Sequence, residues 1–230
     1  MKSCLLTFVG CFLTASFLSA QQPSPDQIGP GGNYRKVPDQ PLPKAETSVE
    51  KLGEGRYRMG QILINAKEKE LQFPVALGIT DSSPLEYVLV HSHGKTHESL
   101  LITDVSPELL HVAALLLSVK GKREVKLVLS WNVYGPEEEV EVSDLIRILL
   151  PEQYDDLPLS YDAAILSDGT LAAQMELSIV ALIDDPMAMV RHEIPSEQNS
   201  DEVYRVNTDH QLPKKGLPLT LTMKFAQAES

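Results

Sequence analysis

The sequence predicts an α+β domain that is predominantly β, in which an antiparallel or mixed sheet packs on one buried helix at about residues 106–120. Three observations lead to this fold class. Apolar and polar residues alternate along several segments, which is typical of strands with one buried face. One strongly apolar segment has helix signals at both ends, and two shorter segments, residues 143–150 and 185–189, indicate short extra helices.

The alternating segments define the predicted strands. The clearest is the closing run, in which every second residue is apolar: Leu219, Leu221, Met223 and Phe225. A second run has the same period through Val125, Leu127, Leu129 and Trp131. Residues 71–77 also alternate, and Pro74 predicts an edge strand there because proline has no N–H to donate. Further strands are expected at residues 57–64, 85–91, 161–167 and 171–183, the last two joined by an Asp168-Gly169 turn.

The predicted helix begins after Ser106, a good N-cap, with Pro107 at its first position and Glu108 complementing the helix dipole. Residues 109–119 are apolar nearly all round, and Gly121 follows as a C-terminal glycine. A helix with so little polar surface is expected to be buried against the sheet.

The N-terminus has the layout of a cleavable signal peptide. Lys2 precedes an apolar stretch, and small residues end at Ala20, where we expect cleavage. A membrane anchor and lipoprotein processing at Cys11 are the alternatives, but the apolar stretch is short and interrupted. Residues 21–50 hold six prolines and are read as a flexible spacer, followed by a single domain over residues 51–230. The protein is therefore expected to act outside the cytoplasm, in the periplasm or secreted, with no transmembrane segment after cleavage.

Charge and cysteine content narrow the function classes. The net charge is −12, and loss of residues 1–20 with Lys2 makes it about −13. This acidic balance argues against nucleic acid as a partner. Both cysteines, Cys4 and Cys11, lie in the signal peptide, so the mature chain would have no disulfide and no thiolate ligand. A cysteine-free exported domain of this size is more typical of a bacterial envelope than of small eukaryotic secreted domains.

The densest group of polar side chains lies at residues 91–99. His91 and His93 would project from one face of a strand, which suits Zn²⁺ or Cu²⁺, and His97 could return across a turn as a third ligand with Glu98 nearby. The alternative is a solvated turn between strands. Zincin, P-loop, dinucleotide-binding and nucleophile-elbow signatures are absent from the sequence.

Several motifs resemble the YdjY-domain proteins of Planctomycetes and related bacteria. The most specific is Gly-Lys-Thr-His-Glu-Ser at residues 94–99, followed by Asp-Val-Ser-Pro at 104–107 and the apolar helix. Similar matches follow at residues 127–131, 142–146, 168–169, 181–186 and 212–221. The resemblance covers most of residues 55–225 and implies an exported bacterial domain whose activity is not established.

The resemblance also bears on cofactors and site residues. The family name is associated with ferredoxin-like proteins, but an Fe–S cluster normally needs cysteine thiolates, so none is expected here. The matched motif runs from Gly94 to Ser99, which directs attention to Lys95, His97, Glu98 and Ser99 as a ligand-binding group. In an extended segment Lys95, His97 and Ser99 would share one face, with Glu98 on the other.

Three functional hypotheses follow. The first is a non-catalytic binding or interaction module of the cell envelope, whose partner is an envelope component or a small anionic ligand. The second is a metal-binding protein or metal-dependent hydrolase that uses His91, His93, His97 and Glu98. The third is purely structural, with His97 and Glu98 fixing the turn that leads to the helix.

Overall fold

The computed structural model describes residues 48–132, 135–150, 157–192 and 202–227. The predicted signal peptide and nearly all of the predicted spacer lie outside these residues. Most described strands belong to one large sheet, and β9 (Ile146–Ile148) pairs with β13 (Tyr204–Val206) in a separate two-stranded sheet.

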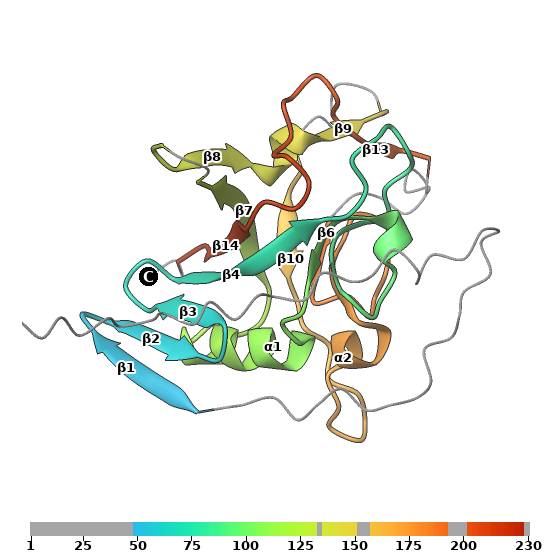
Figure 1. The fold of residues 1–230 in the computed structure, drawn as a ribbon. Helices are drawn as coiled ribbons and strands as arrows, with labels where there is room; N and C mark the ends of the chain where they lie inside the picture. The colour runs from blue at the N-terminus through green and yellow to red at the C-terminus, as the bar shows by residue number, and fades with distance from the viewer. Residues whose placement is uncertain (1–47, 133–134, 151–156, 193–201, 228–230) are drawn as a thin grey trace, which may run out of the picture. The chain divides into compact units, whose positions relative to one another are not determined.

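The large sheet closes on itself as a barrel of eight strands, which Figure 1 shows around its centre. Taken in order around the barrel, the strands are β4 (Glu70–Leu77), β14 (Leu219–Phe225), β7 (Arg123–Trp131), β10 (Leu159–Tyr161), β12 (Val190–His192), β11 (Ser178–Ala181), β5 (Tyr87–His91) and β6 (Ser99–Thr103). The pairing of β4 with β6 closes the ring. Two neighbouring pairs, β5 with β6 and β11 with β12, are parallel, and the other pairs are antiparallel.

Three more strands continue the sheet from β4 as consecutive hairpins, and one pairs with β7. They are β1 (Val49–Gly53), β2 (Arg56–Met59), β3 (Ile62–Asn65) and β8 (Glu138–Glu141). The strands expected at the two clearest alternating runs are present as β7 and β14. Their registers place Leu127 beside Met223 and Leu129 beside Leu221, so the apolar faces of both strands enter one buried core.

The expected packing of a sheet on one buried helix is wrong. Because the strands form a closed barrel, the inner face of the sheet is filled by its own side chains and needs no helix as a covering layer. The helix itself forms as α1 (Pro107–Leu116), and the hydroxyl of Ser106 accepts a hydrogen bond from the N–H of Leu109. It buries only one face, and Leu115 and Leu116 are about half exposed.

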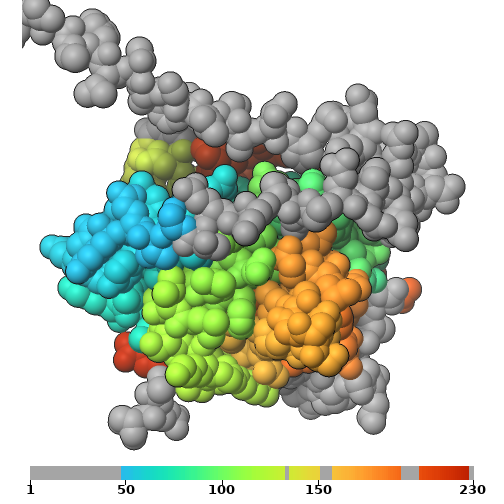
Figure 2. Space-filling model, turned by 90° about the horizontal axis from the view of Figure 1, so that it is seen from below, coloured from blue at the N-terminus to red at the C-terminus, as the bar shows by residue number. Residues whose placement is uncertain are grey.

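The second helix, α2 (Ala172–Glu176), occupies the start of a segment where a strand was expected. It ends at Leu177, whose backbone is left-handed, and the chain then enters β11. The N–H of Glu108 donates to the side chain of Gln174, which ties α1 to α2. Figure 2 shows the two helices side by side, α1 in green and α2 in orange. Neither helix of the described residues has the length and apolar composition that spanning a membrane requires.

The short extra helices were also predicted in the wrong places. Residues 142–145 form a 3₁₀ helix, and β9 follows directly where the helix was expected to continue. Residues 185–189 form turns, in which the carboxylate of Asp185 accepts a hydrogen bond from the N–H of Met187. Asp185 thus makes a local cap-like bond, but no helix follows it.

Pro74 does not mark a sheet edge, because β4 has neighbours on both sides. One side of β4 is covered by β14, and the other by β3 up to Gln72 and by β6 from Ala76 onward. Pro74 therefore lies where one neighbour replaces the other. The hydroxyl of Thr103 donates to its carbonyl oxygen at 2.8 Å. Proline is tolerated in this internal strand because no registered neighbour on that side needs its missing N–H.

Candidate functional site

Residues 92–98 connect two parallel strands, and this topology determines where the Gly94–Ser99 motif lies. In the parallel pair, Tyr87 at the start of β5 is registered with Ser99 at the start of β6. The connection must therefore return from the end of β5 to the level of its beginning. It does so through a turn closed by a bond from the N–H of Gly94 to the carbonyl of His91, and then a 3₁₀ helix at Thr96–Glu98. The motif is consequently folded, so the shared face that Lys95, His97 and Ser99 would have in an extended segment does not form.

The backbone of Gly94 packs so closely against His91 and Leu177 that a larger residue would force neighbouring atoms to move. A Cβ atom at this position would lie 3.1 Å from the carbonyl oxygen of His91 and 3.1 Å from both the Cβ and the carbonyl oxygen of Leu177. The carbonyl of Leu177 also accepts a hydrogen bond from the N–H of His91 at 3.0 Å. The first glycine of the motif therefore lets the connection pack against the junction of α2 and β11.

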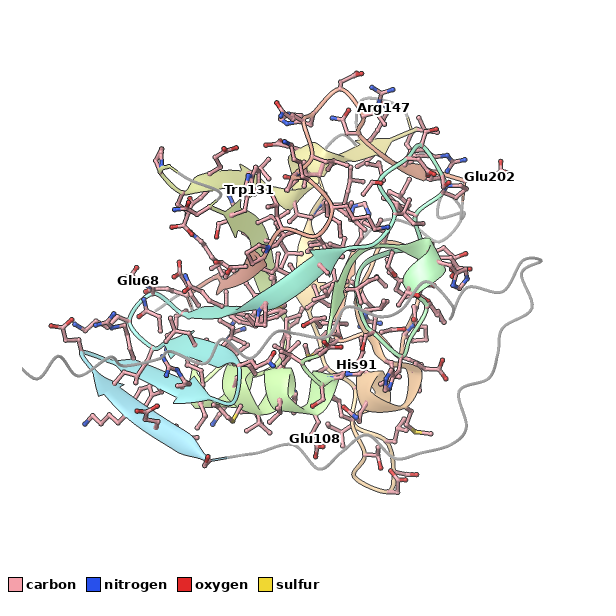
Figure 3. The ribbon with its side chains drawn as sticks, in the orientation of Figure 1. Glu68, His91, Glu108, Trp131, Arg147 and Glu202 are labelled. Atoms are coloured by element: carbon pink, nitrogen blue, oxygen red, sulfur yellow. The ribbon has the colours of Figure 1, made fainter. Side chains whose placement is uncertain are left out.

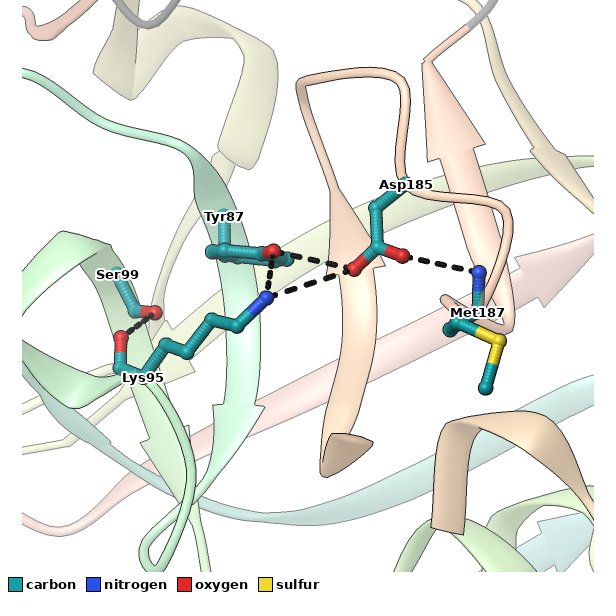
Figure 4. Close-up of polar contacts among 5 residues, drawn as sticks. All are labelled: Tyr87, Lys95, Ser99, Asp185 and Met187. Carbon is teal, nitrogen blue, oxygen red and sulfur yellow. Dashed lines mark hydrogen bonds and ion pairs between the residues drawn. The ribbon is translucent and has the colours of Figure 1, made fainter. Parts of the chain in front are cut away.

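Lys95 follows and reaches a buried tyrosine and a buried aspartate (Figure 4). Its Nζ donates to the hydroxyl of Tyr87 at 2.5 Å and lies 4.8 Å from the centre of that ring. The Tyr87 hydroxyl donates in turn to Oδ2 of Asp185 at 3.1 Å, while Lys95 Nζ is 4.0 Å from the same oxygen. Tyr87 and Asp185 are buried, whereas the Lys95 side chain is 37% exposed. We call these three residues the Lys95 cluster.

The surroundings keep Lys95 and Tyr87 protonated at neutral pH. Burial raises the pKa of Tyr87, more than the hydrogen bond from Lys95 lowers it. Burial alone would lower the pKa of Lys95, but the Tyr87 hydroxyl and the carboxylates of Asp185 and Glu176 raise it overall. The site thus holds a fixed ammonium beside a neutral phenol.

The remaining residues of the predicted ligand-binding group divide into two sets. The hydroxyl of Ser99 is buried and donates to the backbone carbonyl of Lys95 at 2.8 Å, so it braces the turn. His97 and Glu98 are partly exposed and contact each other, with Nε2 of the imidazole 2.7 Å from Oε1 of the carboxylate. The structure therefore brings Lys95 together with Ser99, and His97 together with Glu98.

Two of the three predicted metal ligands are close neighbours. The rings of His91 and His93 pack edge to face with centroids 5.2 Å apart, and the backbone N–H of His93 donates to Nδ1 of His91. His91, labelled in Figure 3, is buried. Burial lowers its pKa, as does His93, while Asp104 acts in the opposite direction. Within the described residues, no group of three or more histidine, cysteine, aspartate or glutamate side chains is arranged to hold a metal ion.

Sequence reasoning missed two members of the Lys95 cluster. Tyr87 lies in a segment predicted only as a strand, and Asp185 begins a segment predicted as a short helix. They are 98 residues apart in the chain, so no local spacing links them. Their proximity comes from the antiparallel pairing of β5 with β11, which places the loop after β11 beside the start of β5.

Comparison with family models gave no match, and comparisons with curated proteins and with solved structures gave none either. Function is therefore inferred from the geometry of the described residues, and the resemblance to YdjY-domain proteins stays an expectation.

Proposed function

We propose that the protein is a non-catalytic binding module of the bacterial cell envelope, and that the Lys95 ammonium contacts an anionic group of its ligand. The observation that carries the proposal is the fixed position of this ammonium. Tyr87 holds it by a hydrogen bond and by its ring face, while more than a third of the side chain stays exposed. An exported location is part of the proposal and is supported by the signal-like N-terminus and the resemblance to YdjY-domain proteins.

The protonation states favour binding over catalysis. A tyrosine whose pKa is raised is a poor general base at neutral pH, and a lysine whose pKa is raised is a poor nucleophile. Catalytic tyrosine and lysine side chains usually need shifts in the opposite direction. The Lys95 cluster instead provides a permanent positive charge at a fixed point, which suits recognition of an anion.

The ligand is expected to share the ammonium with Asp185. An ammonium has three N–H donors, and one of them is directed to Tyr87. The Asp185 carboxylate is 4.0 Å away, longer than a close hydrogen bond, which leaves donor capacity for a second anion. Because Asp185 and Glu176 reduce the local positive potential, the site favours weak, reversible binding of a single carboxylate or phosphate group.

The test uses purified residues 21–230 with inorganic phosphate and acetate as probes. Ligand binding to the folded state must raise the melting temperature in a saturable way. We expect this rise in the unsubstituted protein and in Lys120→Gln, which removes an exposed lysine elsewhere, and its loss in Lys95→Gln. An equal response in both variants would show a general salt effect, and no saturable response would reject anion binding.

The non-catalytic part of the proposal has its own test. Hydrolysis of model esters and phosphoesters is measured for the unsubstituted protein and for His97→Ala. Turnover that disappears in His97→Ala while the circular dichroism spectrum is retained would overturn it.

Metal binding is the second candidate, and the closeness of His91 and His93 is the observation that favours it. It is tested by measuring bound transition metal in the purified protein and the melting temperature with and without Zn²⁺. Stoichiometric metal that is lost in His93→Ala would support this candidate. Absence of bound metal together with an unchanged melting temperature at excess Zn²⁺ would reject it.

A further inference from the structure

A groove of about 540 Å³ lies where β7 changes its neighbour, in a part of the barrel that the proposed function does not use. Around the ring, β7 and β5 are separated by three strands in either direction, so the groove and the Lys95 cluster are on opposite sides of the barrel. Trp131 of β7 and His91 of β5, both labelled in Figure 3, mark the two sides.

The groove coincides with a gap in strand pairing. One edge of β7 is paired with β14 over residues 125–131. On the other edge, β10 is registered with residues 123–125 and β8 with residues 128–131, so no described strand residue is registered there with Lys126 or Leu127. The carbonyl of Glu124 accepts a hydrogen bond from Ala226, beyond β14. Because backbone groups alternate between edges along a strand, those of Leu127 face the groove side.

The groove has a buried floor and acidic sides. Buried Val125, Leu127, Val142 and Leu159 contribute to its lining. The exposed acidic residues along it are Glu124, Glu141 and Asp144. None of these three carboxylates forms an ion pair with another residue of the described chain. Lys126 is the one basic residue among the described residues that line the groove.

We propose that this groove docks an extended segment of a partner protein that carries arginine or lysine side chains. The backbone N–H and C=O of Leu127 offer one main-chain hydrogen-bonding position for such a segment. The exposed carboxylates along the groove accept hydrogen bonds from the charged ends of these arginine or lysine side chains. Each feature of the groove thus corresponds to one part of the same partner.

The test measures binding of a seven-residue peptide of alternating arginine and valine, and of the same peptide with glutamate in place of arginine. Isothermal titration calorimetry measures the binding. We expect the basic peptide to bind and the acidic one not to. The double variant Glu141→Gln, Asp144→Asn should weaken binding at least tenfold, and Lys126→Gln should strengthen it severalfold.

A matched control separates docking from general attraction to an acidic protein. Glu54→Gln with Glu68→Gln removes the same charge from the β1–β4 hairpins, where Figure 3 labels Glu68, and should change the affinity less than twofold. Lys95→Gln should also leave it unchanged, so failure of the proposed anion site does not affect this result. Equal weakening in the control and groove variants, or no binding of the basic peptide, would overturn the proposal.

Discussion

In the part of the chain that the structure describes, charged side chains are paired on one side of the barrel and unpaired on the other. At the Lys95 cluster the charges are matched, since the ammonium, the Tyr87 hydroxyl and the Asp185 carboxylate contact one another and two of the three residues are buried. At the groove the carboxylates of Glu141 and Asp144 are exposed and have no ion-pair partner in the described chain. The first arrangement stabilises the fold and leaves one donor group accessible. The second contributes little to stability and is available to a partner.

The largest effect on stability is expected at Asp185. Asp185→Ala leaves the hydroxyl of Tyr87 and the N–H of Met187 without their acceptor in a buried environment, and removes the counter-charge of Lys95. Loss of a buried acceptor and ion-pair partner costs about 2–4 kcal/mol of the free energy of unfolding. Urea denaturation measures the loss. Asp184→Ala, at the exposed neighbouring position, should stay within about 0.5 kcal/mol. Equal stabilities of the two variants would mean that the Lys95 cluster contributes nothing to the fold.

A smaller loss is expected from Gly94→Ala. The new methyl group would press on two backbone oxygens and on Leu177, so the connection must shift, at a cost of about 1–3 kcal/mol. Gly135→Ala is the matched control because a Cβ there meets nothing within 4 Å. It should leave the unfolding free energy nearly unchanged. If both substitutions are neutral in urea denaturation, the close approach at Gly94 does not restrain the Lys95 cluster.

The part of the structure that could be read from the sequence is the part set by local periodicity. The alternation in β7 and β14 correctly predicted two central strands, and Ser106 with Pro107 correctly predicted the start of α1. Closure of the barrel could not be predicted, because it depends on pairings such as β4 with β6 that join strands distant in the chain. Pro74 shows the same limit. Its missing N–H predicted a sheet edge, but Pro74 lies where β6 replaces β3 as the neighbour of β4, so no registered residue needs that N–H.

The candidate site was predicted to a similar extent. The motif identified Lys95 and Ser99, which do lie together, but the shared face that an extended segment would give is absent because the return between parallel strands forms a 3₁₀ helix. Tyr87 and Asp185 give Lys95 its fixed position, and only the tertiary fold brings them to it. Sequence alone could therefore locate the connection but not its partners.

His91, at the opposite end of β5 from Tyr87, provides a test by pH. Its pKa is lowered from the usual 6.5 because burial disfavours the imidazolium, and His93 adds to this effect. The unfolded chain therefore takes up a proton at a higher pH than the folded protein does. Stability that is fully present above pH 6.5 is lost as the pH falls below that value. His91→Asn should lose less stability than the unsubstituted protein between pH 7 and 5.5 in urea denaturation. His210→Asn, at an exposed position, should lose as much as the unsubstituted protein, and a full loss in His91→Asn as well would exclude this role.

The smallest effect on stability is expected where the effect on binding is largest. Glu141→Gln with Asp144→Asn removes two exposed carboxylates that have no ion-pair partner in the described chain, so the free energy of unfolding should change by less than about 0.5 kcal/mol. Relief of repulsion among the groove carboxylates would make any change a slight gain at low salt. A loss above about 1 kcal/mol in urea denaturation would show that these carboxylates hold the fold together. The charged residues on the two sides of the barrel would then differ only in burial. The proposal that the groove is an interaction surface would be rejected.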